Sequence, residues 1–190
     1  MKSDVLMRRA VHCLMALAPV YYLFPVDLPV IGVRRWVLLI AFFAVVGLIE
    51  AIRLPKGILI FGMRPYEKEK IAAFVWAAAG ITAALWLFPH DIASAVIIGM
   101  ALVDPLAGEL RSRKVGTSMC IGVSSLVYLA ICGTTLLIAN HHSVPVVMVL
   151  ALVGTAVAIV SEHFKNAYVD DDFLMACAPG VVMTALALVL

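Results

Sequence analysis

The chain has 190 residues, of which 64% are hydrophobic and only 14% are charged, and its mean hydropathy is +1.09. Soluble domains carry about one quarter charged residues, so this composition excludes an ordinary soluble domain and indicates an integral membrane protein. The formal net charge of +2 is too small, and the charged residues are too dispersed, to indicate that the protein binds nucleic acid.

Long apolar stretches, bounded by Pro, Gly or charged residues, predict seven transmembrane helices, because a bilayer core of roughly 30 Å needs about 20 helical residues. In chain order we expect them at residues 8–25, 34–53, 70–88, 91–110, 118–139, 144–164 and 172–190. The connections are short, so residues 1–190 are expected to form one all-α polytopic domain. The N-terminal MKSDVLMRR lacks a signal-peptide cleavage site, so the first span is expected to stay in the mature protein.

The distribution of Lys and Arg predicts the orientation. With a cytoplasmic N-terminus, only Arg34 and Arg35 fall outside, and the C-terminus also lies outside. The twelve residues that then lie inside are Lys2, Arg8, Arg9, Arg53, Lys56, Arg64, Lys68, Lys70, Arg111, Arg113, Lys114 and Lys165. We therefore expect a multi-pass membrane protein whose chemistry faces the cytoplasm.

Ionisable residues near the ends of spans are costly in a bilayer, which makes them candidates for function. In RRAVH, Arg9 and His12 are three residues apart and share a helix face. Taken alone, this segment favours Arg8 and Arg9 as interfacial charges and His12 as a packed side chain.

The connection after the second span carries a further group. Glu50 and Arg53 have the i,i+3 spacing of a pair within one helix. The segment MRPYEKEK that follows contains Arg64 and Glu67. Taken alone, it favours a solvated helix end of mixed charge.

The segment ALVDPLAGELRSRK, residues 101–114, carries the most chemistry. Asp104 lies deep in a span, precedes Pro105, and has the small residues Ala101, Ala107 and Gly108 around it, which allow close approach of a ligand. A carboxylate there suits Mg²⁺. An Asp that caps a kink is the structural alternative, and a functional role is favoured because nothing else requires the charge.

The residues after this segment suit phosphates. Arg111, Arg113 and Lys114 together provide the charge to hold a polyphosphate. Thr117 and Ser118 open the next helix, where free N–H groups also favour anions.

The segment SEHFKNAYVDDDF, residues 161–173, brings acids to the last connection. Glu162 ends the sixth span, and Asp170, Asp171 and Asp172 precede the seventh. We expect one of these three to cap the helix, which leaves two as candidates for a divalent cation.

Together these groups suggest phosphoryl transfer from a soluble nucleotide to a lipid hydroxyl at one bilayer face. The sequence contains no GxxxxGK[ST] loop and no HRD or DFG motif, which excludes P-loop and protein-kinase mechanisms as far as motifs can.

The chain resembles the polyprenol kinase superfamily, which includes dolichol kinase, phytol kinase and the CTP-dependent diacylglycerol kinases. The resemblance runs from Arg8 to Pro179 in five ordered segments, RRAVH, EAIRL, MRPYEKEKIAAFVWAAAG, VDPLAGELRSRKVGTS and SEHFKNAYVDDDFLMACAP. The matching positions are Arg9, His12, Glu50, Arg53, Arg64, Glu67, Trp76, Asp104, Ala107, Gly108, Lys114, Gly116, Thr117, Ser118, Glu162 and Asp171. In three respects the chain departs from the family: Val103 replaces a usual Gly, the acid of the follow-on motif is missing, and Asp172 stands where Asn is common.

The resemblance implies a membrane kinase that transfers the terminal phosphate of a nucleotide, usually CTP, to a polyprenol, prenyl alcohol or diacylglycerol. Under this hypothesis Asp104, with Asp171 or Asp172, holds Mg²⁺, and Arg9 stabilises the transferring charge. His12 and Glu162 are the alternative bases for the lipid hydroxyl. The expected nucleotide-binding residues are Arg64, Glu67, Gly108, Arg111, Arg113, Lys114, Thr117 and Ser118, and Glu50 and Arg53 are expected as a structural pair beside them.

Two other functions stay open. A cytidylyltransferase that makes a CDP-lipid would use the same metal, CTP and bilayer face. A small transporter would normally place ionisable groups near the bilayer midplane, whereas here they crowd one face. The sequence does not distinguish a monomer from a homo-oligomer.

Overall fold

The structure is a computed structural model that describes residues 2–28, 32–60, 62–164 and 169–190. Within these residues it has seven α-helices, two 3₁₀ helices and one two-stranded antiparallel hairpin. The elements are α1 (Lys2–Met15), η1 (Ala18–Leu23), β1 (Asp27–Leu28), β2 (Val33–Arg34), α2 (Trp36–Arg53), η2 (Pro65–Lys68), α3 (Ala73–Leu87), α4 (His90–Ser112), α5 (Thr117–Ala139), α6 (Val144–His163) and α7 (Asp171–Ala187).

The expected first helix at residues 8–25 is wrong in its extent. The helix α1 already begins at Lys2 and ends at Met15, and the chain continues as η1. Pro19 stands at the start of η1, where it lacks the N–H for an α-helical hydrogen bond and disfavours the helical conformation of the preceding residue. The other six helices begin and end within three residues of their expected positions.

Within the described residues, four helices are long and apolar enough to cross a membrane: α2, α4, α5 and α6. The apolar helix α3 has 15 residues, α1 has 14 and α7 has 17, so these three are shorter than an ordinary span. The expected all-α class is confirmed, and four of the described helices could cross a membrane by length and composition.

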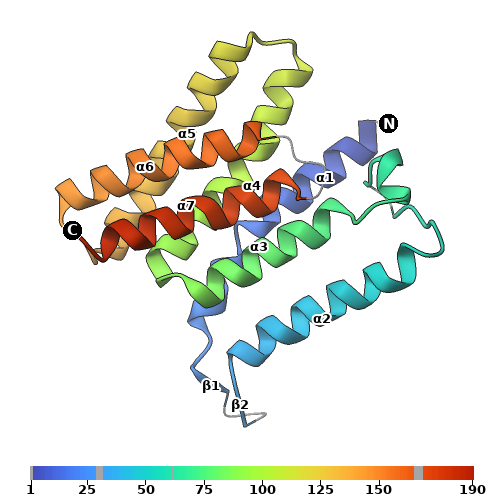
Figure 1. Ribbon diagram of the computed structural model, residues 1–190, viewed down its shortest axis with the longest axis horizontal. Helices are drawn as coiled ribbons and strands as arrows, with labels where there is room; N and C mark the ends of the chain where they lie inside the picture. Colours follow the sequence, from blue (N-terminus) through green and yellow to red (C-terminus); the bar gives the residue numbers. More distant parts are fainter. Residues whose placement is uncertain (1, 29–31, 61, 165–168) are drawn as a thin grey trace.

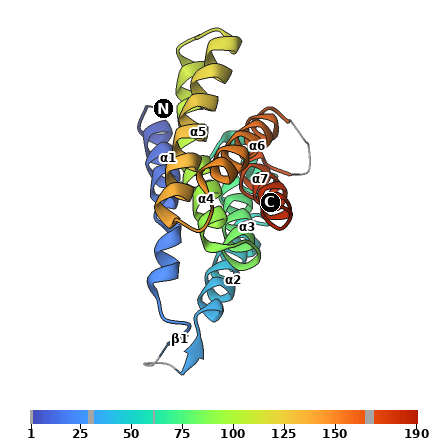
Figure 2. The same ribbon diagram turned by 90° about the vertical axis from the view of Figure 1, so that its left-hand side faces the viewer.

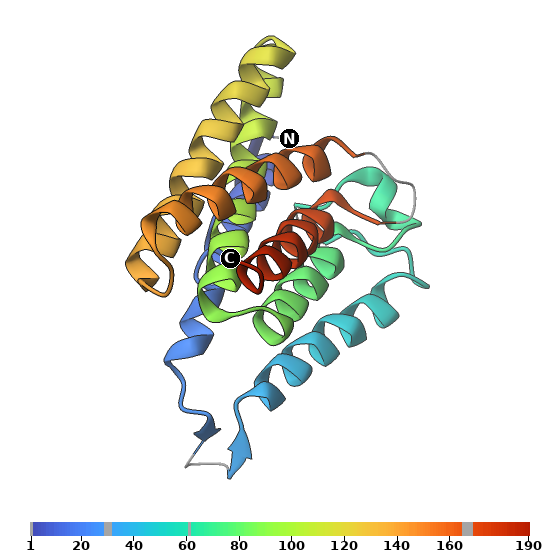
Figure 3. The same ribbon diagram turned by 60° about the vertical axis from the view of Figure 1, so that its left-hand side comes forward.

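The helix α4 lies at the centre of the bundle (Figures 1 and 2). It packs against α1, α3, α5, α6 and α7, and its side chains Ile92, Val96, Met100 and Val103 are fully buried. The helix α2 packs mainly against α3 and lies at the margin of the bundle (Figure 3). Its large apolar side chains, such as Phe42 and Val45, are exposed, as expected of a helix that faces lipid.

The connections divide between two ends of the bundle (Figure 1). One end, here the basic end, holds the N-terminus, the α2–α3 connection, the α4–α5 turn and the start of α7. The other, here the hairpin end, holds η1, β1 and β2, the α3–α4 and α5–α6 turns and the C-terminus. Arg34 and Arg35 lie at the hairpin end, and the other described Lys and Arg side chains lie at the basic end. The side chain of Lys2 and the whole of Lys165 lie outside the described residues.

Candidate functional site

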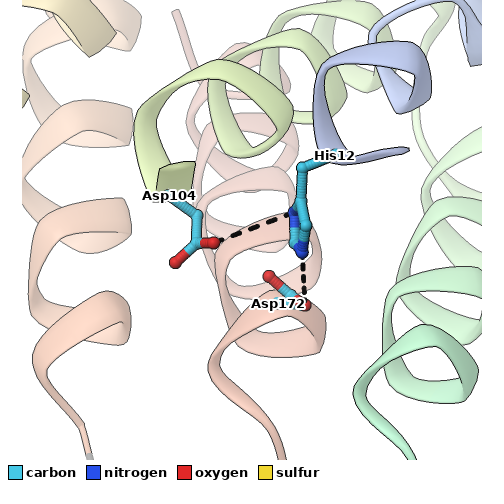
Figure 4. A group of neighbouring side chains, drawn as sticks. All are labelled: His12, Asp104 and Asp172. Atoms are coloured by element: carbon cyan, nitrogen blue, oxygen red, sulfur yellow. Dashed lines mark ion pairs between the residues drawn. The ribbon is translucent and has the colours of Figure 1, made fainter. Parts of the chain in front are cut away.

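Three helices bring one histidine and two acids together at the basic end (Figure 4). His12 from α1 is buried between Asp104 from α4 and Asp172 from α7. Its Nδ1 lies 3.8 Å from Asp104 Oδ2, and its Nε2 lies 3.7 Å from Asp172 Oδ2. Among the described residues His12 Nδ1 has no hydrogen-bond partner. The imidazole is therefore held between two carboxylates from two other helices.

A polar cavity of about 270 Å³ adjoins this group. It is lined by four arginines, one histidine, two acids, one proline and one glycine: Arg8, Arg9, Arg64, Arg111, His12, Asp104, Asp171, Pro105 and Gly108. A Cβ added at Gly108 would meet no atom within 4 Å, so this glycine leaves the wall of the cavity open. Because the cations outnumber the carboxylates, the cavity suits an anion of several charges.

The three acids at the start of α7 lie close to one another, and Asp172 lies beside His12. Asp170 caps α7, since its Oδ1 accepts a hydrogen bond from the backbone N–H of Asp172 at 3.3 Å, which confirms that one of the three acids is a cap. Ligand atoms of Asp170, Asp171 and Asp172 lie within 4.8 Å of one another, as do those of His12, Asp104 and Asp172. Asp172 thus belongs to both groups.

The electrostatics of these acids fit a divalent cation. Burial, followed by the hydrogen bond with Asp171 and repulsion from its charge, raises the pKa of Asp170 to about 7. A cation between the carboxylates would relieve this repulsion. Mg²⁺ takes oxygen ligands, usually one or two carboxylates together with waters and phosphates, so the residues present fit that ion.

Two arginines of the cavity are held by acids. Arg9 forms an ion pair with Glu109 of α4, and Glu109 also binds Arg113 Nε at 2.6 Å. Arg111 forms an ion pair with Glu162 of α6. These pairs fix α1 and α6 to the end of α4 and orient the guanidinium groups.

Glu162 does not line the cavity beside His12. It lines a separate pocket of about 220 Å³ with Arg111, Thr117 and His163, and Arg111 contributes to both. The side chain of Glu162 is fully buried, and His163 Nδ1 lies 2.8 Å from its Oε2. Of the two bases expected from the sequence, His12 is therefore the one that reaches the polar cavity.

The expected pair of Glu50 and Arg53 is present and buried. Arg53 Nε and Nη2 donate to the two carboxylate oxygens of Glu50 at 2.7 and 2.6 Å. Arg53 also donates to the carbonyl oxygens of Glu67 and Lys70, each at 2.8 Å, and Glu50 accepts from the N–H of Ala72 at 3.0 Å. The pair therefore fixes the connection between α2 and α3.

Glu67 is used locally rather than in the cavity. Its two carboxylate oxygens accept hydrogen bonds from the backbone N–H groups of Arg64 and Ala73, the latter at 2.8 Å. Glu67 was expected to bind nucleotide, but both of its carboxylate oxygens are already hydrogen-bonded to the backbone. Arg64 does line the cavity.

Other expected nucleotide ligands lie outside the cavity. Arg113, Lys114, Thr117 and Ser118 are exposed at the α4–α5 turn, where Lys114 has a left-handed backbone with φ of 58°. Of these, Thr117 lines the separate pocket beside Arg111. Of the expected nucleotide-binding residues, the structure thus brings Arg64, Gly108 and Arg111 to the cavity.

Sequence reasoning missed Arg8 as a lining residue of the cavity. Arg8 and His12 are four residues apart, so they share a face of α1 as closely as Arg9 and His12 do. That spacing was the available signal. Glu109, which holds both Arg9 and Arg113, was also missed.

A second, apolar pocket of about 120 Å³ adjoins the polar cavity. Arg8 and His12 line both, and the remaining walls come from α1, the α2–α3 connection and the start of α3: Met7, Val11, Met15, Ile60, Gly62, Met63, Glu67, Ala73 and Phe74. His12 therefore lies where a polar and an apolar chamber meet.

Comparisons of the chain with protein family models, with curated proteins and with solved structures find no match.

Proposed function

We propose that this protein is a multi-pass membrane kinase that transfers the terminal phosphate of a nucleotide, CTP in preference, to a lipid alcohol. The observation that carries the proposal is the junction at His12, where a cavity lined by four arginines meets a pocket lined by apolar side chains. A phosphate donor and a lipid acceptor need these two environments side by side.

The polar cavity would receive the triphosphate. Arg8, Arg64 and Arg111 line it and provide charge-assisted hydrogen bonds to phosphate oxygens. Arg9, fixed by Glu109, would stabilise the charge that develops on the transferring group. The acids Asp104, Asp171 and Asp172 would hold Mg²⁺, which neutralises charge on the phosphate oxygens when it is bound.

His12 would act as the general base. The oxygen of the lipid hydroxyl forms a bond to the terminal phosphorus while the bond from that phosphorus to the bridging oxygen breaks, and the electron pair leaves with the nucleoside diphosphate. The hydroxyl proton would pass to a ring nitrogen of His12, whose ring is held between Asp104 and Asp172.

The lipid alcohol would enter laterally from the bilayer. The apolar pocket beside His12 accommodates only the first few carbons of a chain at about 120 Å³, so the rest of the tail would lie along the lipid-exposed surface of α1. This arrangement supports selection of the hydroxyl-bearing end rather than of tail length.

The same arrangement supports a location in a membrane with the basic end in the cytoplasm. Soluble nucleotide is available there, and the clustering of Lys and Arg agrees with the positive-inside rule. Seven crossings require α1, α3 and α7 to span with their flanking residues, since each is shorter than an ordinary span.

The test is a phosphoryl-transfer assay on detergent-purified protein with labelled CTP or ATP, Mg²⁺ and a panel of lipid alcohols. The parent is expected to form lipid phosphate, and Asp104→Asn and His12→Gln are expected to lose about 100-fold or more in rate. Asp27→Asn, an exposed acid at the hairpin end, is the matched control and should keep full rate.

The products separate this proposal from its rival. Lipid phosphate with CDP supports the kinase, whereas CDP-lipid with pyrophosphate would identify a cytidylyltransferase at the same site. If protein that shows a thermal unfolding transition, and is therefore folded, forms no lipid product with any donor, both the kinase and the cytidylyltransferase are refuted.

A further inference from the structure

Two of the buried acids outside the polar cavity lie beside a histidine. Asp91 of α4 meets the α5–α6 turn at the hairpin end, where His142 Nε2 lies 3.1 Å from Asp91 Oδ2. Glu162 of α6 lies at the basic end, where His163 Nδ1 lies 2.8 Å from Glu162 Oε2. Glu162 also lines the pocket of about 220 Å³ that shares Arg111 with the polar cavity, so this pocket is the stronger candidate for a ligand.

The pocket lies where α4 ends, α5 begins and α6 ends. The left-handed backbone of Lys114 (φ of 58°) turns the chain, and the N–H of Val115 donates to the carbonyl oxygen of Leu110 at 3.1 Å. Cys120 Sγ lies 3.8 Å from the carbonyl oxygen of Ala107, which keeps the first turn of α5 against α4. The residues that line the pocket are Arg111, Val115, Thr117, Cys120, Glu162 and His163.

The pocket differs from the polar cavity in its charge. Four arginines and two acids line the cavity, which leaves it cationic. In the pocket the one arginine and the one glutamate, Arg111 and Glu162, pair with each other, so their charges offset. Val115 and Cys120 add apolar surface, and Thr117 adds a hydroxyl. Such a lining suits a neutral and partly apolar group with a few polar atoms.

Arg111 stands at the border of the two spaces. Its Nη1 is held by Oε1 of the fully buried Glu162, which fixes the guanidinium between the cavity and the pocket. An anion bound by Arg8, Arg64 and Arg111 therefore reaches the edge of the pocket, and a group attached to that anion continues into it. A nucleoside triphosphate has this order of parts, because its phosphates are charged and its base is neutral.

The side chains of the pocket fit a base and its ribose. His163 is 38% exposed, and its Nδ1 lies 2.9 Å from the carbonyl oxygen of Ile159 as well as beside Glu162, so the ring is held in place. Bases commonly stack on a histidine ring or on the plane of an arginine guanidinium. The Thr117 hydroxyl both donates and accepts hydrogen bonds, and the first N–H groups of α5 lack acceptors within the helix.

We propose that this pocket binds the nucleoside part of the phosphate donor, with the base and ribose against His163 and Thr117 and the phosphates in the polar cavity. The inference rests on the proposed function and deepens it. It makes the donor a nucleoside triphosphate rather than an inorganic polyphosphate, since inorganic polyphosphate would leave the pocket empty.

The test compares the binding of CTP with that of inorganic triphosphate, by calorimetry on the full chain in detergent with Mg²⁺. Inorganic triphosphate fills only the polar cavity, so the ratio of the two dissociation constants measures what the nucleoside contributes. The parent is expected to bind CTP about tenfold or more tightly than triphosphate, as the stacking of one base allows.

His163→Ala is expected to lose about tenfold in affinity for CTP and to keep its affinity for triphosphate, because only the stacking surface is removed. Thr117→Val should weaken CTP binding about threefold, again with triphosphate unchanged. His141→Ala, the same substitution at an exposed histidine of the hairpin end, is the matched control and should bind both ligands as the parent does.

Equal affinity of the parent for CTP and triphosphate would overturn the proposal, and this comparison needs no variant to fold. An equal loss of both ligands in His163→Ala, or no loss of either, would also overturn it. The kinase can fail separately: if the nucleoside contribution is present and falls in His163→Ala but no lipid phosphate forms, the pocket is confirmed and the kinase is refuted. Lipid phosphate formed by a protein whose ratio is unchanged in His163→Ala keeps the kinase and refutes the pocket.

Discussion

At the scale of single residues, the structure divides the basic side chains into those that face the cavity and those that face solvent. Arg8, Arg64 and Arg111 line the cavity, whereas Arg113 is 72% exposed and paired with Glu109. Sequence spacing alone groups Arg111 with Arg113, because both follow the same segment. The helical turn separates them, since residues two apart point to different faces.

This division predicts unequal effects on nucleotide binding. Arg8→Gln removes a charge that lines the cavity and is expected to raise the KM for the nucleotide about tenfold, which corresponds to the loss of one charge-assisted hydrogen bond. Arg113→Gln removes an exposed charge and should change KM less than about twofold. Steady-state kinetics on both variants measures the difference, and equal effects would contradict the assignment of Arg8 to the phosphates.

Many residues of the candidate site could be predicted from the sequence, and there is a physical reason why the others could not. Asp104 was expected as a functional residue because charge deep in a span is costly, His12 because of the family resemblance, and Asp172 as one of three consecutive acids. The structure brings the three together. Glu67 was expected to bind nucleotide, yet its oxygens cap the start of η2 and α3. Nothing in a sequence tells whether a carboxylate will be satisfied by nearby backbone N–H groups or by a ligand.

At the scale of elements, buried polar pairs and close helix contacts hold the bundle. The pair of Glu50 and Arg53 fixes the α2–α3 connection, because Arg53 donates to the carbonyl oxygens of Glu67 and Lys70 and Glu50 accepts from the N–H of Ala72. The helices α4 and α5 approach closely where Gly99 faces the ring of Tyr128. Helix ends were predictable from Pro, Gly and charge, but the break after Met15 was not, because an apolar stretch reads as one helix through Pro19.

Removing Arg53 should unfold the connection between α2 and α3. Arg53→Met leaves the buried carboxylate of Glu50 without its partner, which is expected to lower the free energy of unfolding by about 3–5 kcal/mol. Glu50→Gln combined with Arg53→Met should recover part of that loss, because the uncompensated charge is gone. Denaturant unfolding in detergent measures both, and an Arg53→Met protein as stable as the parent would refute the structural role of the pair.

A methyl group at Gly99 should separate α4 from α5. Its Cβ would lie 2.5 Å from Tyr128 Cε2, so Gly99→Ala is expected to destabilise the protein by about 1–3 kcal/mol. Gly122→Ala in α5 is the matched control, since its Cβ would meet nothing within 4 Å and the higher helix propensity of Ala should leave stability equal or slightly raised. Thermal unfolding midpoints compare the two; a stable Gly99→Ala protein would show that the contact between α4 and α5 is looser than described.

At the scale of the whole molecule, the two ends differ in chemistry. The basic end carries arginines, acids and the polar cavity, whereas the hairpin end carries three of the five histidines, at positions 90, 141 and 142. The sequence predicted that most Lys and Arg residues gather at one end of the bundle, because the orientation of a membrane protein depends on the charge of its connections. It gave no sign that Asp91 meets the α5–α6 turn, since that contact depends on how α4 and α5 cross.

Orientation is testable by labelling cysteines from each side of the membrane. In a Cys13→Ala background, which removes the exposed native cysteine, Lys114→Cys should react with an impermeant maleimide only after the membrane is opened. Asp27→Cys should react in intact cells. The reverse pattern would place the basic end outside and would remove the access to cytoplasmic nucleotide on which the kinase proposal depends.

The group of His12, Asp104 and Asp172 draws on α1, α4 and α7, the first, the central and the last of the described helices. During synthesis α1 and α4 leave the ribosome well before α7. A nascent chain that has inserted its first six helices therefore holds the histidine and one acid but lacks Asp172, so it has no complete site. Under the proposed function, activity would begin only when α7 docks, and a half-made protein in the membrane would consume no nucleotide.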